Sequence, residues 1–192
     1  MNNTMHGVTL RVFVLFVCVF NSAFVDAQQC VTPDGFTLVS AEGQVIQTFD
    51  ALPDLIQTTS HGAEQTNKPV TLVNLWAVWC PPCLKELPML DSIANQADFA
   101  IETIHLGHNA DALQKRFDEL NIQHLPKNIE PDYALLDRWG FRGLPATLIV
   151  VNNQVHYRSA GYLHQSADEL AHWLSCLSQS SASLSNTNKG AQ

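Results

Sequence analysis

The sequence predicts an α/β fold in which helices flank a central mixed β-sheet, with a β-hairpin as an N-terminal extension. Residues 70–77 and 99–106 are nearly continuous apolar runs, which are typical of strands buried on both faces. A helical pattern follows each run, and strands that alternate with helices require parallel crossover connections. Two shorter runs, residues 146–151 and 155–159, flank a turn at Asn152-Asn153 and add antiparallel strands.

The first elements follow from local signals. Residues 36–40 and 44–49 are β-like runs around a Glu-Gly turn, and they form the expected hairpin. A helix is expected over residues 81–96 because its leucines and isoleucine recur at helical intervals. Pro88 should bend this helix, since proline has no N–H to donate.

Three signals place the later helices. Asn109 is a suitable N-cap for a helix whose apolar residues recur at i, i+4 and i+7. A short helix is expected over residues 132–139, ending at the glycine that follows. Ser166 and Glu169 have the spacing of a capping box and open the last helix. The polar segment from residue 179 to residue 192 is expected to be a disordered tail.

The N-terminal segment is expected to be a signal peptide over residues 1–27. An apolar run at residues 12–25 is followed by Val25-Asp26-Ala27, with compact residues at the positions that signal peptidase requires. The run is shorter than the roughly 20 residues that span a bilayer as a helix, although an uncleaved anchor remains the alternative. The sequence therefore predicts a periplasmic protein whose domain covers residues 28–178.

Composition narrows the class of protein. The chain has 192 residues, which suits one domain, and 46% of them are hydrophobic, which suffices for a core. Its formal charge is −8 and its ten Lys and Arg are scattered, so no nucleic-acid partner is expected. We expect a monomer that needs no cofactor.

Cysteine arithmetic yields two candidate disulfides. Cys18 leaves with the signal peptide, and an even number of cysteines in an exported protein favours disulfides. The two-residue spacing makes Cys80 and Cys83 a local pair, which leaves Cys30 and Cys176 as a structural disulfide. Alternatively, Cys30 and Cys176 are unpaired thiols or relay electrons to the local pair.

The local pair is placed for redox chemistry. A strand runs into Trp79-Cys80-Pro81-Pro82-Cys83 and then into a helix, so Cys80 lies at a helix N-terminus. Free N–H groups and the positive end of the helix dipole stabilise a thiolate there, and the thiolate is the species that attacks a disulfide. Pro81 suits the first helical position and Pro82 stiffens the loop. Cys83, one turn further, is suited to resolve the mixed disulfide.

Two other interpretations of Cys80 and Cys83, a zinc site and a structural disulfide, have less support in the sequence. Structural zinc needs two more ligands, but a second Cys-x-x-Cys is absent and His105 and His108 follow a whole helix and strand, so no metal site is expected. A structural disulfide across two residues restricts little chain entropy and stabilises little. Redox activity is therefore the favoured interpretation.

Two segments resemble a known family. Residues 76–88, WAVWCPPCLKELP, resemble the active-site segment of the thioredoxin superfamily, specifically the exported TlpA-like thiol:disulfide reductases that include those of cytochrome c maturation. Residues 143–147, GLPAT, resemble the superfamily's cis-proline loop. The resemblance covers residues 36–177 and implies a thioredoxin-like fold with a cis Leu144–Pro145 bond. It also implies that Trp79, Leu144 and Pro145, with Pro81 and Pro82, contact the client protein.

The resemblance also assigns an acid. Thioredoxin resembles this chain but carries a buried aspartate where Asn74 stands, and Asn74 cannot titrate. TlpA-like proteins instead carry an acid three residues after the second cysteine, which is Glu86 here. A buried carboxylate on the Cys83 face of the helix can move protons during exchange. Ala146 departs from the family pattern, because cytochrome-maturation members often carry Glu after the cis proline.

These observations predict a periplasmic protein-disulfide oxidoreductase that reduces exported clients, with Cys80, Cys83 and Glu86 as catalytic residues. The resemblance implies a membrane electron donor. Two alternatives use the same cysteines. One is a thiol oxidase or isomerase, since a strongly stabilised thiolate makes the disulfide oxidising. The other is a non-catalytic Cu(I) chaperone or assembly factor with two soft thiolate ligands.

Overall fold

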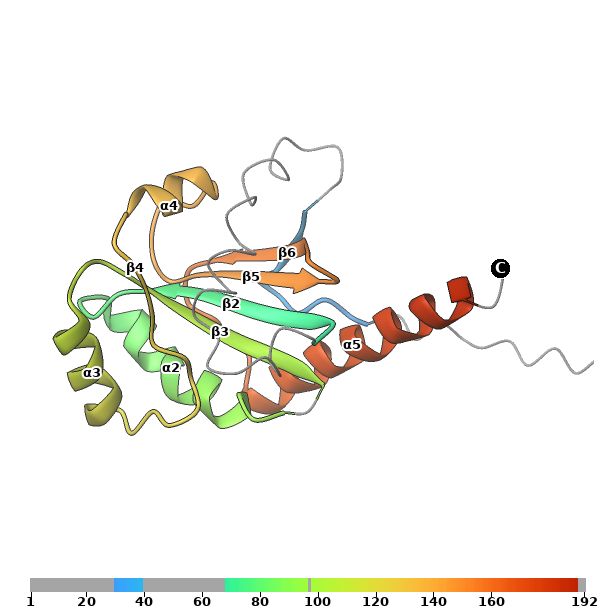
Figure 1. The fold of residues 1–192 in the computed structure, drawn as a ribbon, viewed down its shortest axis with the longest axis horizontal. Helices are drawn as coiled ribbons and strands as arrows, with labels where there is room; N and C mark the ends of the chain where they lie inside the picture. The colour runs from blue at the N-terminus through green and yellow to red at the C-terminus, as the bar shows by residue number, and fades with distance from the viewer. Residues whose placement is uncertain (1–29, 40–67, 97, 190–192) are drawn as a thin grey trace, which may run out of the picture.

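The computed structural model describes residues 30–39, 68–96 and 98–189, with side chains up to residue 183. Its strands form a six-stranded mixed sheet in the order β1-β6-β5-β2-β3-β4 (Figure 1). The strands are β1 (Thr37–Leu38), β2 (Val70–Trp76), β3 (Phe99–Leu106), β4 (Asn128–Glu130), β5 (Ala146–Val151) and β6 (Gln154–Ala160). The helices are α2 (Pro81–Ile93), α3 (Ala110–Glu119), α4 (Ala134–Arg138) and α5 (Ala167–Lys189).

Strand direction follows the connections. β2, β3 and β4 pair in parallel, because helix α2 crosses over from β2 to β3 and helix α3 from β3 to β4. β5 pairs antiparallel with β2 and with β6, which closes the hairpin through Asn152 and Asn153. Both turn residues have positive φ (49° and 64°), as the two-residue hairpin turn requires. β5 is therefore the strand that joins the parallel half of the sheet to the antiparallel half.

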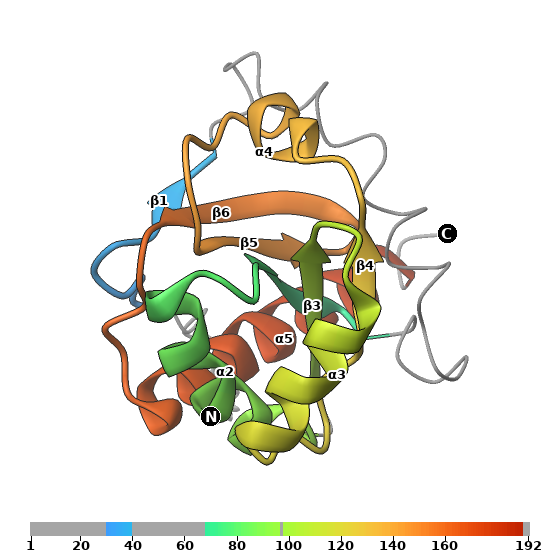
Figure 2. The ribbon, with the colours of Figure 1, turned by 90° about the vertical axis from the view of Figure 1, so that its left-hand side faces the viewer.

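The sheet separates two apolar layers. Helices α2, α3 and α5 cover one face, and α4 lies on the other (Figure 2). Trp76, Cys83 and Trp173 belong to the larger layer, whereas Leu135 and Trp139 belong to the smaller one. The apolar residues of β2 alternate between these layers, so both faces of the strand are covered. This explains why the run at residues 70–77 is apolar almost throughout.

The structure contains most of the expected elements and differs from the prediction at β4, at the end of α2 and at the C-terminal segment. The expected partner strand of β1, residues 44–49, lies outside the described residues, and β1 itself pairs antiparallel with β6. β4 is a three-residue strand that no periodicity could reveal. Helix α2 ends at Ile93, three residues earlier than expected, and Pro88 lies within it.

The third correction concerns the C-terminal segment. A disordered tail was expected from residue 179, but α5 continues to Lys189. One serine of this segment is buried: Ser181, whose Oγ donates to Ser178 O (2.8 Å). Ser178, just before the segment, is buried as well, and its Oγ donates to Asp98 O (2.6 Å). Small hydroxyl side chains can thus pack on the domain because each hydrogen bond lost to water is replaced. Polar composition alone therefore misjudged this segment.

Candidate active site

Cys80 and Cys83 form a disulfide at the N-terminus of α2. Cys80 is the N-cap residue, and its Sγ accepts a hydrogen bond from the backbone N–H of Cys83 (3.3 Å). Pro81 and Pro82 occupy the first helical positions, where the N–H of a residue has no partner within the helix. Cys80 is 3% exposed and Cys83 is 0% exposed, so both are buried and Cys80 is the more accessible of the two.

The cis-proline loop lies beside the end of β2. The Leu144–Pro145 peptide bond is cis, as the resemblance implies. Ala146 pairs with Leu75, so Pro145 follows in register beside the last residue of β2, just before the loop that carries Cys80. The carbonyl of Pro145 accepts from the N–H of Gly161 (2.9 Å), and Leu144 packs against the layer that contains both cysteines. The register of β5 on β2 therefore brings residues 60 positions apart in sequence to one site.

Glu86 is buried behind the disulfide. It lies one turn after Cys83 on the same face of α2, and both side chains are fully buried. Its Oε1 accepts from Asn74 Nδ2 (2.9 Å) and its Oε2 accepts from the N–H of Leu163 (3.0 Å). Burial raises the pKa of Glu86 to about 7, and the hydrogen bonds from Leu163 and Asn74 lower it in part. Such a carboxyl group can hold or release a proton near neutral pH.

Asn74 has a role that the sequence did not indicate. Its amide donates to Thr147 Oγ1 (3.1 Å) as well as to Glu86, so it joins β2, β5 and α2 at one point. The sequence analysis treated Asn74 only as a missing acid, and it did not find Leu163. A polar residue inside the apolar run 70–77 was the available signal for Asn74, because a buried amide needs a partner. Leu163 contributes only its backbone N–H, so its side chain carries no signal.

Trp79 is the exposed member of the site. Its side chain is 62% exposed and stacks on Tyr133, with ring centroids 6.3 Å apart and planes inclined by 29°. Its indole Nε1 donates to the Tyr133 hydroxyl (3.0 Å). An exposed indole next to the attacking cysteine can contact a client without any rearrangement. Tyr133 was not predicted as a site residue.

The second disulfide lies elsewhere. Cys30 is bonded to Cys176 of α5, which ties the first described residues to the last helix. A cavity of about 600 Å³ borders this disulfide, with His164, His172 and Trp173 among its lining residues. Within residues 30–39, 68–96 and 98–189, no three His, Cys, Asp or Glu side chains are grouped to hold a metal ion.

A dithiol at a helix mouth with a cis proline beside it is the combination found in proteins of thioredoxin-like fold, and the mixed sheet flanked by helices has that architecture. A family model described as Redoxin matches residues 41–171. Since this match covers more than half of the chain, the chain belongs to the Redoxin family.

Curated relatives are thiol:disulfide proteins. The chain is 33% identical over 117 residues to the thiol:disulfide interchange protein DsbE of Pasteurella multocida, a match that covers 59% of this chain and 64% of that protein. It is 29% identical over 93 residues to the thiol:disulfide interchange protein CycY of Rhizobium leguminosarum, covering 48% and 50% respectively. The chain therefore spans half to two thirds of the length of these relatives.

Among solved structures, a secreted thiol-disulfide isomerase from Corynebacterium glutamicum superposes with a TM-score of 0.49 at 17% identity. The superposition covers 57% of this chain and 71% of that one.

Proposed function

We propose that the chain is a thiol:disulfide oxidoreductase that reduces disulfides in exported client proteins through Cys80 and Cys83. One observation carries the proposal: the Cys80–Cys83 disulfide caps α2, and a buried carboxyl group with a pKa of about 7 lies one turn behind it. The names of the two curated relatives support the same chemistry. A zinc site or a purely structural crosslink has no use for such a carboxyl group.

The reaction begins from the reduced dithiol. The Cys80 thiolate attacks one sulfur of the client disulfide, a mixed disulfide forms, and the client's other sulfur leaves as a thiolate. The N–H of Cys83 and the N-terminus of α2 stabilise the Cys80 thiolate, which lowers the free energy needed to form it. Cys83 then attacks Cys80, the second client thiolate leaves, and the protein holds the Cys80–Cys83 disulfide. Two electrons have passed to the client.

Glu86 supplies the proton step. Cys83 is fully buried, so its thiol cannot release a proton directly to solvent. The ionised Glu86 carboxylate takes this proton, and the leaving client thiolate is protonated from solvent. Asn74 and the Leu163 N–H hold both carboxylate oxygens, which keeps the ionised form accessible despite burial.

The cis-proline loop and Trp79 bind the client. Leu144 precedes the cis bond and is half-buried, so its backbone is available to an extended client segment beside the disulfide. Pro81 is exposed at the mouth of α2.

The proposed clients are exported proteins with disulfides, and a membrane protein regenerates the dithiol. The proposed location is the periplasm; among the described helices, none has both the length and the apolarity needed to cross a bilayer.

The test is the equilibrium reduction potential of Cys80–Cys83, combined with insulin reduction. A potential of about −270 mV together with catalysed insulin reduction supports a reductase. A potential of about −120 mV identifies an oxidase instead. A protein that neither reduces the disulfides of insulin nor oxidises the thiols of reduced insulin, while binding Cu(I) through both thiolates, refutes the enzymatic proposal.

A further inference from the structure

Tyr133 lies outside the two segments that carry the family resemblance, residues 76–88 and 143–147. Its side chain nevertheless contacts Trp79, the residue before the attacking cysteine. Trp79 Nε1 donates to the Tyr133 hydroxyl at 3.0 Å, and the two rings stack at 6.3 Å. Both side chains are exposed, at 62% and 44%. Burial therefore does not fix the indole, and a specific partner is needed to give it one orientation.

The hydroxyl of Tyr133 lies next to a glycine, Gly107, which has no side chain to obstruct it. Gly107, directly after β3, has a φ of 117°, which side-chain-bearing residues rarely adopt. A Cβ added to Gly107 would lie 2.8 Å from the Tyr133 hydroxyl, closer than a Cβ normally lies to another heavy atom, so the hydroxyl would have to move. The N–H of Gly107 donates to the carbonyl of Glu130 (2.9 Å), which joins the end of β3 to the segment that carries Tyr133. The missing side chain at residue 107 thus makes room for the hydroxyl.

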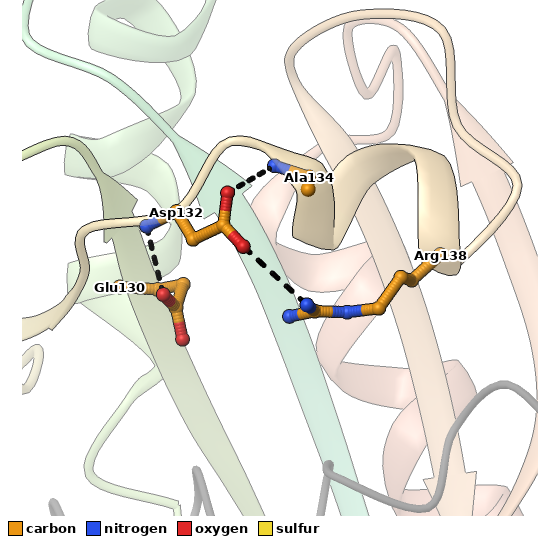
Figure 3. Close-up of polar contacts among 4 residues, drawn as sticks. All are labelled: Glu130, Asp132, Ala134 and Arg138. Carbon is orange, nitrogen blue, oxygen red and sulfur yellow. Dashed lines mark hydrogen bonds and ion pairs between the residues drawn. The ribbon is translucent and has the colours of Figure 1, made fainter.

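The backbone on both sides of Tyr133 is also fixed. The N–H of Asp132 donates to Glu130 Oε1 (2.8 Å), and Asp132 Oδ1 accepts from the N–H of Ala134 (2.8 Å) (Figure 3). The other oxygen of Asp132 is paired with Arg138 Nη1 (3.4 Å), one turn into α4. Tyr133 lies between two residues whose main-chain N–H groups are both held. The backbone that carries Tyr133 is therefore held on both sides, which restricts where its ring can lie.

We propose that Tyr133 is a positioning residue that fixes the Trp79 indole beside Cys80 and thereby sets the affinity of the dithiol for protein clients. The inference rests on the proposed exchange function. A fixed indole loses less conformational freedom when a client binds, so its contact contributes more to affinity. Tyr133 itself takes no part in bond exchange; it acts through Trp79.

The test uses Tyr133→Phe, which removes the hydroxyl and keeps the stacked ring. Tyr157→Phe is the matched control, because Tyr157 also packs on a tryptophan, Trp173, with ring centroids 5.1 Å apart. Indole N–H signals of nitrogen-15-labelled protein report directly on Trp79, whose signal is assigned from Trp79→Phe. The other three tryptophans are buried.

In Tyr133→Phe we expect the Trp79 indole N–H signal to move upfield and its exchange with solvent to accelerate. The KM for insulin should rise about three- to tenfold, the range for one hydrogen bond, with kcat unchanged. The rate with hydroxyethyl disulfide, which has no polypeptide chain to pack on Trp79, should not change. Tyr157→Phe should leave both the signal and the KM as in the wild type.

An unmoved Trp79 signal, or a KM for insulin equal to that of the wild type, overturns the inference. A fall in kcat with both disulfides also overturns it, since it assigns Tyr133 to the chemistry rather than to client binding. These outcomes differ from failure of the proposed function, in which the wild-type protein itself exchanges neither disulfide.

Discussion

The two disulfides of this chain close loops of very different length and lie in different surroundings. Cys80 and Cys83 are 3 positions apart, whereas Cys30 and Cys176 are 146 positions apart. In the chain-entropy account the stabilisation by a crosslink grows with the loop it closes, so the long loop contributes most of the stabilisation. The short loop instead has a helix N-terminus and a buried carboxyl group beside it. Stability and exchange chemistry are thus assigned to separate bonds.

Replacement of Cys80 by Ser should have the largest effect. Without the attacking thiolate, the rate of insulin reduction should fall at least about a thousandfold. The free energy of unfolding of the oxidised protein should change little, because the lost three-position crosslink restricts little chain. Reduction assays and urea denaturation measure the two quantities. A Cys80→Ser variant that retains wild-type activity would refute the assignment of Cys80.

For the Cys30–Cys176 disulfide we expect the opposite pattern, a loss of stability with activity retained. In Cys30→Ala/Cys176→Ala the free energy of unfolding should fall by about 5 kcal/mol, with a Tm lower by roughly 10–20 °C. Insulin reduction at 25 °C should continue at the wild-type rate. Calorimetry and the same reduction assay test this. Loss of activity in a protein that is still folded would show that Cys30 and Cys176 relay electrons, which breaks the division between the two bonds.

The role of Glu86 beside the short-loop disulfide can be tested against a matched control, the buried carboxyl group of Glu102. Glu102 on β3 is also buried, accepts from an asparagine (Asn128 Nδ2, 2.9 Å), and has its pKa raised by burial to about 7. However, Val73, its partner in the sheet, faces the α4 layer, so Glu102 lies on the face opposite the disulfide. We expect Glu86→Gln to slow exchange about a hundredfold and to abolish the rise in rate through pH 7. Glu102→Gln should leave the rate profile unchanged.

Both carboxyl groups should nevertheless affect stability in the same direction. Between about pH 4.5 and pH 7 the unfolded carboxyl ionises while the folded one keeps its proton. The free energy of unfolding therefore falls as pH rises through this window, by at most about 3 kcal/mol per group, and levels off above pH 7. Each Gln variant should lose its share of this decline. Equal pH–rate profiles for Glu86→Gln and Glu102→Gln would contradict a proton-transfer role for Glu86.

The smallest effect is expected for Asn74→Ala. The hydrogen bond from Asn74 lowers the pKa of Glu86, so its removal raises that pKa further. The midpoint of the pH–rate profile should move upward by no more than about one pH unit, the equivalent of one neutral hydrogen bond. Stopped-flow measurements of exchange from pH 5 to pH 9 provide the profile. A downward shift would show that Asn74 does not act on Glu86.

The strands and the dithiol could be read from short stretches of sequence. β2, β3 and β5 have continuous apolar runs, and the caps at Asn109 and Ser166 are present: Asn109 Oδ1 accepts from Ala112 N–H (2.9 Å) and Ser166 Oγ from Glu169 N–H (3.2 Å). These signals are local, so spacing suffices to detect them. The end of α5 was misjudged because polar composition does not reveal that Ser181 is buried and that its hydroxyl bonds to the carbonyl of Ser178 within the helix.

The site shows the same division. Cys80, Cys83 and Glu86 lie within one turn-and-helix segment, and their spacing alone places them together. The partners of Glu86 come from β2 and from the loop after β6, and Tyr133 precedes α4. Such partners cannot be recognised from the sequence, because they are far apart along the chain and only the packing of the sheet brings them close.

The sequence by itself determined the α/β class, the dithiol at a helix N-terminus and the acid one turn behind it, because each depends on interactions between residues a few positions apart. Only the tertiary structure decided how Glu86 is buried and held and which residue contacts Trp79. Those features depend on desolvation and on contacts between distant segments, and neither is fixed until strands and helices pack.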